Sequence, residues 1–135
     1  MTRPSVEGER LMATRRFHLI LIVSSHPGRL TARHSTIRQA GYHALPTCSV
    51  GHAVILAHKA RPSVVLADIT LDDGRALSLV RVFRAREALR HVPVILLGVP
   101  LPDEEEDIAH DPHTHVYRDA EEATLIALIE KHLVA

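Results

Sequence analysis

The chain has 135 residues, which is the length of one domain, and its sixteen basic and sixteen acidic side chains give a formal net charge of zero. This balance argues against binding nucleic acid or an anionic membrane surface through bulk charge, because such binding normally needs an excess of basic residues. The single cysteine, Cys48, excludes an intramolecular disulfide and a cysteine-based zinc cluster, and it indicates a reducing, cytoplasmic location.

The chain begins with a polar segment and continues with short apolar runs. Residues 1–16 lack periodicity and are interpreted as an N-terminal extension, which places the domain at residues 17–135. Apolar runs predict five strands, at residues 19–23, 42–45, 64–67, 94–97 and 114–117. None of them approaches the length of about 18 residues that a membrane span needs.

Segments with helical spacing of apolar residues lie between these strands. They predict helices at about residues 28–40, 50–57, 77–83 and 125–133. Gly41 is expected to stop the first of these helices. The acidic run at residues 103–107 is expected to be a solvated loop or helix face, and it could open a short helix because the peptide dipole is positive at a helix start.

This alternation of strands and helices predicts an α/β fold with a parallel sheet covered on both faces. Five strands in a chain of this length fit the flavodoxin-like (βα)5 three-layer sandwich with strand order 2-1-3-4-5. Ligands of such sheets gather beyond the carboxyl ends of the strands, at the switch point between the first and third strands.

Polar residues follow the predicted strands at this edge. Residues 24–26, Ser-Ser-His, follow the first strand, Asp68 follows the third, Gly98 the fourth and Arg118 the fifth. A carboxylate in such a place needs water, a cation or a hydrogen-bond donor to meet it. We therefore expect Asp68 to pair with Arg118 or to cap the next helix.

The order of these segments resembles a response-regulator receiver domain of the chemotaxis-regulator type. The segments that carry the resemblance are the strand and loop at 19–27, the Gly-Tyr-His at 41–43, the third strand and its loop at 61–74, and the fourth strand at 92–97. Each is weak alone, but together they extend from about residue 17 to residue 133. The resemblance implies that Asp68 is at the phosphoacceptor position.

Two serines stand where the family has an acidic pair. In receivers this pair follows the first strand and helps to hold Mg²⁺ beside the phosphoacceptor, whereas this chain has Ser24 and Ser25. Mg²⁺ in proteins is usually anchored by carboxylates. We therefore expect no cofactor, at most weak metal binding by Asp68, and slow phosphoryl transfer to it.

Three further positions of the switch and the phosphate contact also depart from the family. Gly98 replaces the hydroxyl residue at the end of the fourth strand, Arg118 replaces the lysine after the fifth, and His115 falls near the aromatic position. Arginine retains the charge and can bind phosphate, but it is not an equivalent point charge. Conventional phospho-switching is not expected from this set of residues.

Three functions follow as hypotheses. The first is a stand-alone atypical receiver in two-component signalling that acts through protein contacts with a histidine kinase, a downstream effector or a second copy of itself. The second is a working phosphoacceptor in which Asp72 and Asp73 supply the missing carboxylates, although Asp-Asp-Gly is ordinary turn chemistry. The third is a flavodoxin-like protein that binds phosphate or a nucleotide at residues 24–31. No residue pattern indicates an enzyme.

The histidines and the charge distribution raise two further expectations. His113 and His115, two residues apart, could bind Zn²⁺ or Ni²⁺ with a carboxylate, but a polar loop leading into a strand is the favoured interpretation. His26 could tune the pocket of Asp68. Arginines are concentrated at residues 75–86 and carboxylates at 103–107 and 121–122, which favours head-to-tail or partner contacts.

Overall fold

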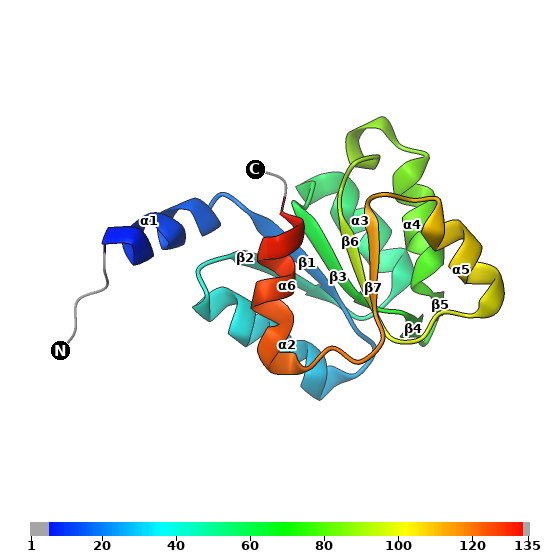
Figure 1. Cartoon of the computed structure of the whole chain (residues 1–135), viewed down its shortest axis with the longest axis horizontal. Helices are drawn as coiled ribbons and strands as arrows, with labels where there is room; N and C mark the ends of the chain where they lie inside the picture. The colour runs from blue at the N-terminus through cyan, green and yellow to red at the C-terminus, as the bar shows by residue number, and fades with distance from the viewer. Residues whose placement is uncertain (1–5, 134–135) are drawn as a thin grey trace.

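A computed structural model of the chain, which describes residues 6–133, contains a five-stranded parallel sheet (Figure 1). Its strand order is β2-β1-β3-β6-β7. The strands are β1 (Leu19–Val23), β2 (His43–Thr47), β3 (Val64–Asp68), β6 (Val94–Leu97) and β7 (Thr114–Tyr117). In order along the chain these are strands one to five of the sheet, so the predicted order 2-1-3-4-5 is confirmed.

Helices cover both faces of this sheet (Figure 1). They are α2 (Pro27–Gln39), α3 (Val50–Ala60), α4 (Ala76–Arg84), α5 (Pro102–Ala109) and α6 (Leu125–His132). Helices α2 and α6 pack on one face, and α3, α4 and α5 pack on the other. Two 3-10 turns, η1 (Glu87–Leu89) and η2 (Glu122–Thr124), complete the connections. No helix within residues 6–133 is long and apolar enough to cross a bilayer.

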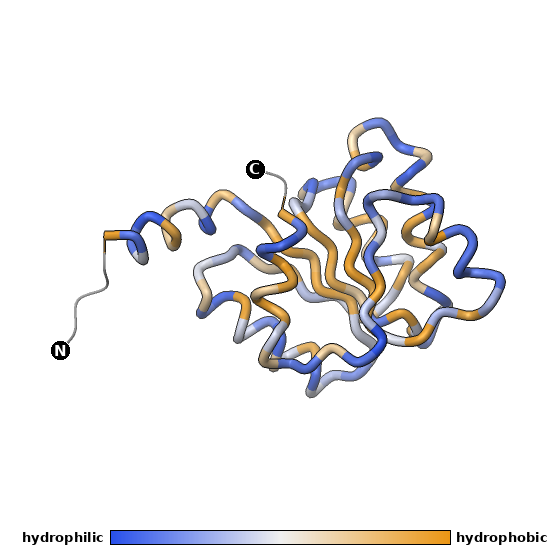
Figure 2. The backbone as a smooth tube through the Cα atoms, in the orientation of Figure 1, coloured by the Kyte–Doolittle hydropathy of each residue, from blue (hydrophilic) through white to orange (hydrophobic). Residues whose placement is uncertain are grey.

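The central strands are almost continuously hydrophobic (Figure 2), because each face of the sheet has its own core. In β1, Leu21 and Val23 point to the core under α3 and α4, while Ile20 and Ile22 point to the core under α2 and α6. Successive side chains of a strand alternate between faces, so a continuous apolar run is what a doubly covered strand requires.

Helix α1 (Val6–Arg15) occupies most of the segment predicted to be an extension. It buries none of its residues and projects from the rest of the chain (Figure 1). Its last residue fastens it to the domain, because Arg15 Nη1 donates to Ala40 O at 2.8 Å and Arg15 pairs with Glu130. Residues 1–5 and 134–135 lie outside the described part of the chain, and the domain boundary at residue 17 stays a prediction.

Asp68 is followed by a short hairpin, which the periodicity of the sequence did not predict. Strands β4 (Thr70–Leu71) and β5 (Gly74–Arg75) pair antiparallel across the Asp72-Asp73 turn. The turn expected from Asp-Asp-Gly is present, and Gly74 adopts a φ of 148°, which favours glycine. This hairpin brings the loop after Asp68 over the start of α3.

The acidic run at residues 103–107 forms part of a helix, α5, and carboxylates in and just after this helix pair with arginines in and just before α4. Ion pairs join Arg75 to Glu104, Arg81 to Asp107, and Arg84 to Asp111, at 2.5, 3.2 and 2.7 Å. Glu104 is only 6% exposed, and its Oε1 also accepts the N–H of Leu101. The expectation of a solvated run is therefore wrong for Glu104, and much of the separated charge is neutralised within the chain.

Candidate functional site

The candidate site lies at the carboxyl ends of β1 and β3, at the switch point of the sheet. Asp68 ends β3 and is 7% exposed, while Ser24 directly follows β1 and is completely buried. The Ser24 hydroxyl donates to Asp68 Oδ2 at 2.6 Å. The parallel register sets Val23 of β1 beside Ala67 of β3, which brings the two following side chains together.

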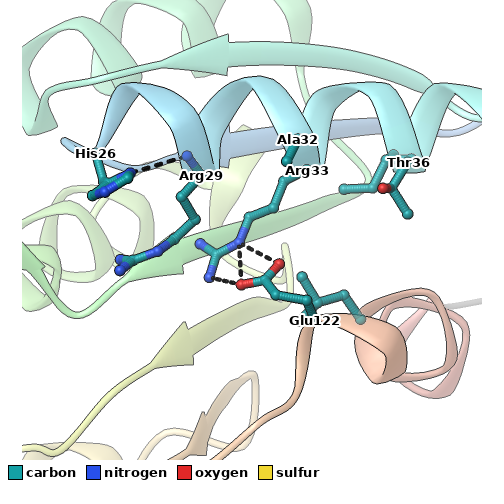
Figure 3. Close-up of a pocket in the computed structure, with 8 residues that line it drawn as sticks. His26, Arg29, Ala32, Arg33, Thr36 and Glu122 are labelled. Carbon is teal, nitrogen blue, oxygen red and sulfur yellow. Dashed lines mark hydrogen bonds and ion pairs between the residues drawn. The ribbon is translucent and has the colours of Figure 1, made fainter.

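Two arginines from α2 hold the same carboxylate. Arg33 Nη1 donates to Asp68 Oδ1 at 2.8 Å, and Arg29 Nη1 donates to Oδ2 at 2.9 Å. Arg33 is 5% exposed and also donates from Nε and Nη2 to the carboxylate of Glu122, at 2.8–3.2 Å (Figure 3). Both oxygens of Asp68 therefore accept charge-assisted hydrogen bonds.

Helical geometry explains why both arginines reach Asp68. Arg29 and Arg33 are four positions apart, so they lie on one face of α2. The helix begins with Pro27 at its first position, and His26 caps it, since His26 Nδ1 accepts the N–H of Arg29 at 3.0 Å. Sequence reasoning missed Arg29, Arg33 and Glu122. The i, i+4 arginine pair on the helix after the first strand was the signal that could have found the arginines.

The electrostatics of this cluster keep its groups charged. Burial on its own would raise the pKa of Asp68, but hydrogen bonds from Ser24, Arg33 and Arg29 outweigh it, and the pKa is lowered from its ordinary value. For Arg33, burial opposes the charge, and the carboxylates of Glu122 and Asp68 more than compensate, so its pKa is raised. At neutral pH the cluster is therefore a partly buried ion-pair network.

Mg²⁺ does not fit this set of donors. The positions of the acidic pair hold serines, and two guanidinium groups lie within hydrogen-bonding distance of the single carboxylate and would repel a cation. Within the described chain, no group of three or more His, Cys, Asp or Glu side chains is arranged to hold a metal ion. These side chains are therefore a poor site for Mg²⁺.

The other residues predicted near the site have structural partners of their own. The Ser25 hydroxyl donates to Cys48 O and accepts the N–H of Asp72, both at 2.9 Å, and so joins three loops. Asp73 accepts the N–H groups of Val50 and Gly51 at 2.9 and 3.2 Å and thus caps α3, which lowers its pKa.

Comparison with known proteins gives relatives of one kind. No protein-family model matches the chain. The polar-differentiation response regulator DivK of Brucella ovis is 30% identical over 76 residues, which are 56% of this chain and 62% of DivK. DivK of Brucella anthropi is 29% identical over the same length. The match thus covers less than two thirds of these relatives.

Solved structures extend the likeness over most of the domain. The receiver domain of the sensor histidine kinase PA1611 from Pseudomonas aeruginosa, solved with a magnesium ion in its active-site cleft, has a TM-score of 0.72 and 25% identity over 84% of this chain and 95% of its own. The chemotaxis response regulator CheY4 of Vibrio cholerae has a TM-score of 0.76 over 86% of this chain and 98% of its own, and its 19% identity shows the fold alone. The chain therefore has the fold of response-regulator receiver domains and is similar to response regulators in sequence.

Arg118 does not contact Asp68. It pairs with Glu105 at 2.5 Å, and its side chain is 56% exposed. The expected pair with Asp68 is wrong in this structure, because Arg33 and Arg29 reach both Asp68 oxygens from α2 and Glu105 on α5 offers Arg118 an exposed partner.

Gly98 has a structural reason for lacking the receiver hydroxyl. Its φ is 136°, a region that favours glycine, and a Cβ at this position would lie 2.4 Å from Ile69 Cγ2. A serine or threonine here would therefore need the Ile69 side chain or its loop to shift, and its backbone would remain strained.

His115, at the receiver's aromatic position, stacks on a second histidine. Its ring centroid lies 3.7 Å from that of His132 on α6, and the Tyr117 hydroxyl contacts His132 Nε2. Burial lowers the pKa of both rings, and a nearby histidine adds to it, His113 for His115 and His115 for His132, whose pKa falls to about 4. His113 instead contacts His91, so the structure does not bring His113 and His115 to one metal site.

Proposed function

We propose that this chain is an atypical receiver in two-component signalling, which acts through protein contacts and in which phosphorylation of Asp68 is weak or absent. It is proposed as a signalling module and not as an enzyme. The observation that carries the proposal is the pairing of Asp68 with two guanidinium groups.

A receiver carboxylate must offer a free oxygen to attack phosphorus. Here Oδ1 accepts from Arg33, and Oδ2 accepts from both Ser24 and Arg29. The hydrogen bonds that lower the pKa of Asp68 stabilise its ionised carboxylate, and this stabilisation makes it a weaker nucleophile. The metal that normally neutralises the transferred phosphoryl group has no carboxylate pair to hold it.

The arginines supply positive charge where receivers use an exchangeable cation. They are covalent parts of α2, so their charge is present at all times and does not depend on an upstream signal. Arg33 also links Asp68 to Glu122, immediately before α6, and thereby joins the site to a helix on the surface. These permanent charges support a domain that keeps one conformation and contacts its protein partner without being phosphorylated.

The partner is proposed to be a histidine kinase, a downstream effector or a second copy of the chain. Val99 and Leu101, in the loop before α5, are 60% and 47% exposed, and α5 itself carries Glu105, which forms an exposed ion pair with Arg118. Exposed apolar residues flanked by charged ones are typical of contact surfaces.

Incubation with acetyl phosphate and Mg²⁺, followed by intact-mass measurement, tests the proposal. We expect no phosphoryl adduct on the wild-type chain, with a conventional receiver labelled in parallel as the positive control. The Asp68→Asn variant identifies labelling at other sites. Acid-stable, base-labile labelling of Asp68 near one group per chain would overturn the proposal and favour the alternative, a working phosphoacceptor with an altered site.

A further inference from the structure

A cavity of about 300 Å³ opens between α2 and the start of α6, beside the Asp68 site (Figure 3). Its lining combines apolar and polar side chains: His26, Arg29, Ala32, Arg33, Thr36, Ile37, Glu122 and Leu125. This volume is at the lower end of the range for small-molecule sites, which typically have apolar walls and a few polar groups that orient the ligand. The cavity is therefore large enough for a compact organic molecule.

Most charged side chains that line the cavity are paired with each other or with Asp68, and the exception lies at the Arg29 end of the cavity. Arg33 is bonded to both Asp68 and Glu122, so neither the cation nor the Glu122 carboxylate is free. Arg29 differs, because only its Nη1 is bonded to a carboxylate and its side chain is 44% exposed. Within residues 6–133, no other group accepts from its guanidinium, which therefore presents unused N–H donors to a ligand.

His26 adds a second donor at the same end. Its Nδ1 accepts the N–H of Arg29 (Figure 3), so the neutral ring carries its proton on Nε2. A negatively charged group placed between His26 and Arg29 would receive donors from both. Ile37 and Leu125, which are both buried, and Ala32 form apolar wall further along the cavity.

From these contacts we propose that the cavity binds a small organic anion. Its acidic group, a phosphate or carboxylate, accepts from Arg29 and His26, and its compact apolar body lies against Ala32, Ile37 and Leu125. A ligand here would contact Arg29, which donates to Asp68 Oδ2. Ligand binding would therefore act on the Asp68 cluster without phosphorylation. The binding site goes beyond the proposed function and does not depend on how Asp68 reacts.

A titration with three probes, followed by NMR chemical shifts or calorimetry, tests the site. Phenyl phosphate has both features, inorganic phosphate only the anion, and benzyl alcohol only the apolar ring. We expect saturable binding of phenyl phosphate that is tighter than that of either other probe. No saturable binding of phenyl phosphate, or equal binding of one of the other probes, would overturn the proposal.

Three variants locate the binding. Arg29→Gln should weaken phenyl phosphate binding about tenfold or more, because a charge-assisted hydrogen bond is lost. Ala32→Phe, at an exposed helical position, should fill the cavity and abolish binding while circular dichroism remains that of the wild type. Arg38→Gln, an exposed arginine on the same helix that does not line the cavity, should bind like the wild type. Wild-type affinity in both Arg29→Gln and Ala32→Phe would show that the probe binds elsewhere and refute the site.

Discussion

Arg33 holds Asp68 with one edge of its guanidinium and Glu122 with another. Its Nη1 lies 2.8 Å from Asp68 Oδ1, and its Nη2 lies 2.8 Å from Glu122 Oε1, so one side chain joins α2 to the end of β3 and to the beginning of η2. The planar fork of arginine suits this bridge, whereas a lysine ammonium would not span both carboxylates in the same way.

Replacement of Arg33 by methionine should destabilise the fold strongly. Arg33→Met leaves the buried carboxylate of Asp68 without its closest cation, and removal of one partner of a buried pair costs about 3–5 kcal/mol. Urea unfolding measures the loss. Arg38→Met, an exposed change on the same helix, should stay within about 0.5 kcal/mol of the wild type. Equal stability of the two variants would contradict a structural role for the bridge.

The contribution of Asp68 to stability should depend on pH. Because the pKa of Asp68 is lowered in the folded chain, its stabilisation is complete above the unfolded pKa of about 4 and is lost as the pH falls through the lowered folded value. Asp68→Asn should cost about 1–3 kcal/mol at pH 7.

The difference in unfolding free energy between Asp68→Asn and the wild type should become smaller at pH values below about 4. Measuring the difference between the two chains removes the contribution of other acids. Asp72→Asn, an exposed change in the nearby turn, is the matched control. A difference that stays constant down to pH 2 would mean that the ion pairs of Asp68 do not stabilise the fold.

Restoring the receiver hydroxyl at position 98 should fail structurally. Gly98→Thr forces a β-branched residue into a φ of 136° and against Ile69, and the strain and the clash together should cost roughly 2–4 kcal/mol. A double-mutant cycle with Ile69→Ala should show a favourable coupling, because the smaller side chain relieves the contact. Additive losses in this cycle would indicate that Ile69 does not limit the position.

Stability should also fall as the stacked histidines take up protons. The pKa of His132 is lowered to about 4 in the folded chain, so between its unfolded value of about 6.5 and about 4 the unfolded chain binds more protons. Thermal unfolding should therefore show a Tm that decreases as the pH falls through this window. The decrease belongs to the histidines, because carboxylates with lowered pKa values lose their contribution at more acidic pH.

His132→Phe keeps an aromatic ring beside His115 without a titrating group, so it should make the Tm less dependent on pH over this range. His58→Gln, an exposed change on α3, should leave the dependence as it is in the wild type. The same pH profile for His132→Phe and the wild type would rule out His132 as its source.

The periodicity of the sequence predicted five strands alternating with helices, and the fit to the flavodoxin-like fold added the strand order and the position of Asp68 at the carboxyl end of the third strand. Strands covered on both faces leave continuous apolar runs such as residues 19–23, and these are visible without coordinates. The sequence also showed that Ser24 and Ser25 replace the acidic pair of receiver domains, because they directly follow the first apolar run.

Only the tertiary structure decided which cation meets Asp68. Arg118 follows β7, which lies two strands from β3 in the sheet, and it pairs with Glu105, while Arg29 and Arg33 reach the carboxylate from α2. The strand order determines which loops lie near each other, whereas the direction of a long side chain depends on which face of a helix carries it and on which carboxylates compete for it. Those distances exist only once α2, β3 and α6 have packed together, so the sequence by itself identified the site and the packing determined its chemistry.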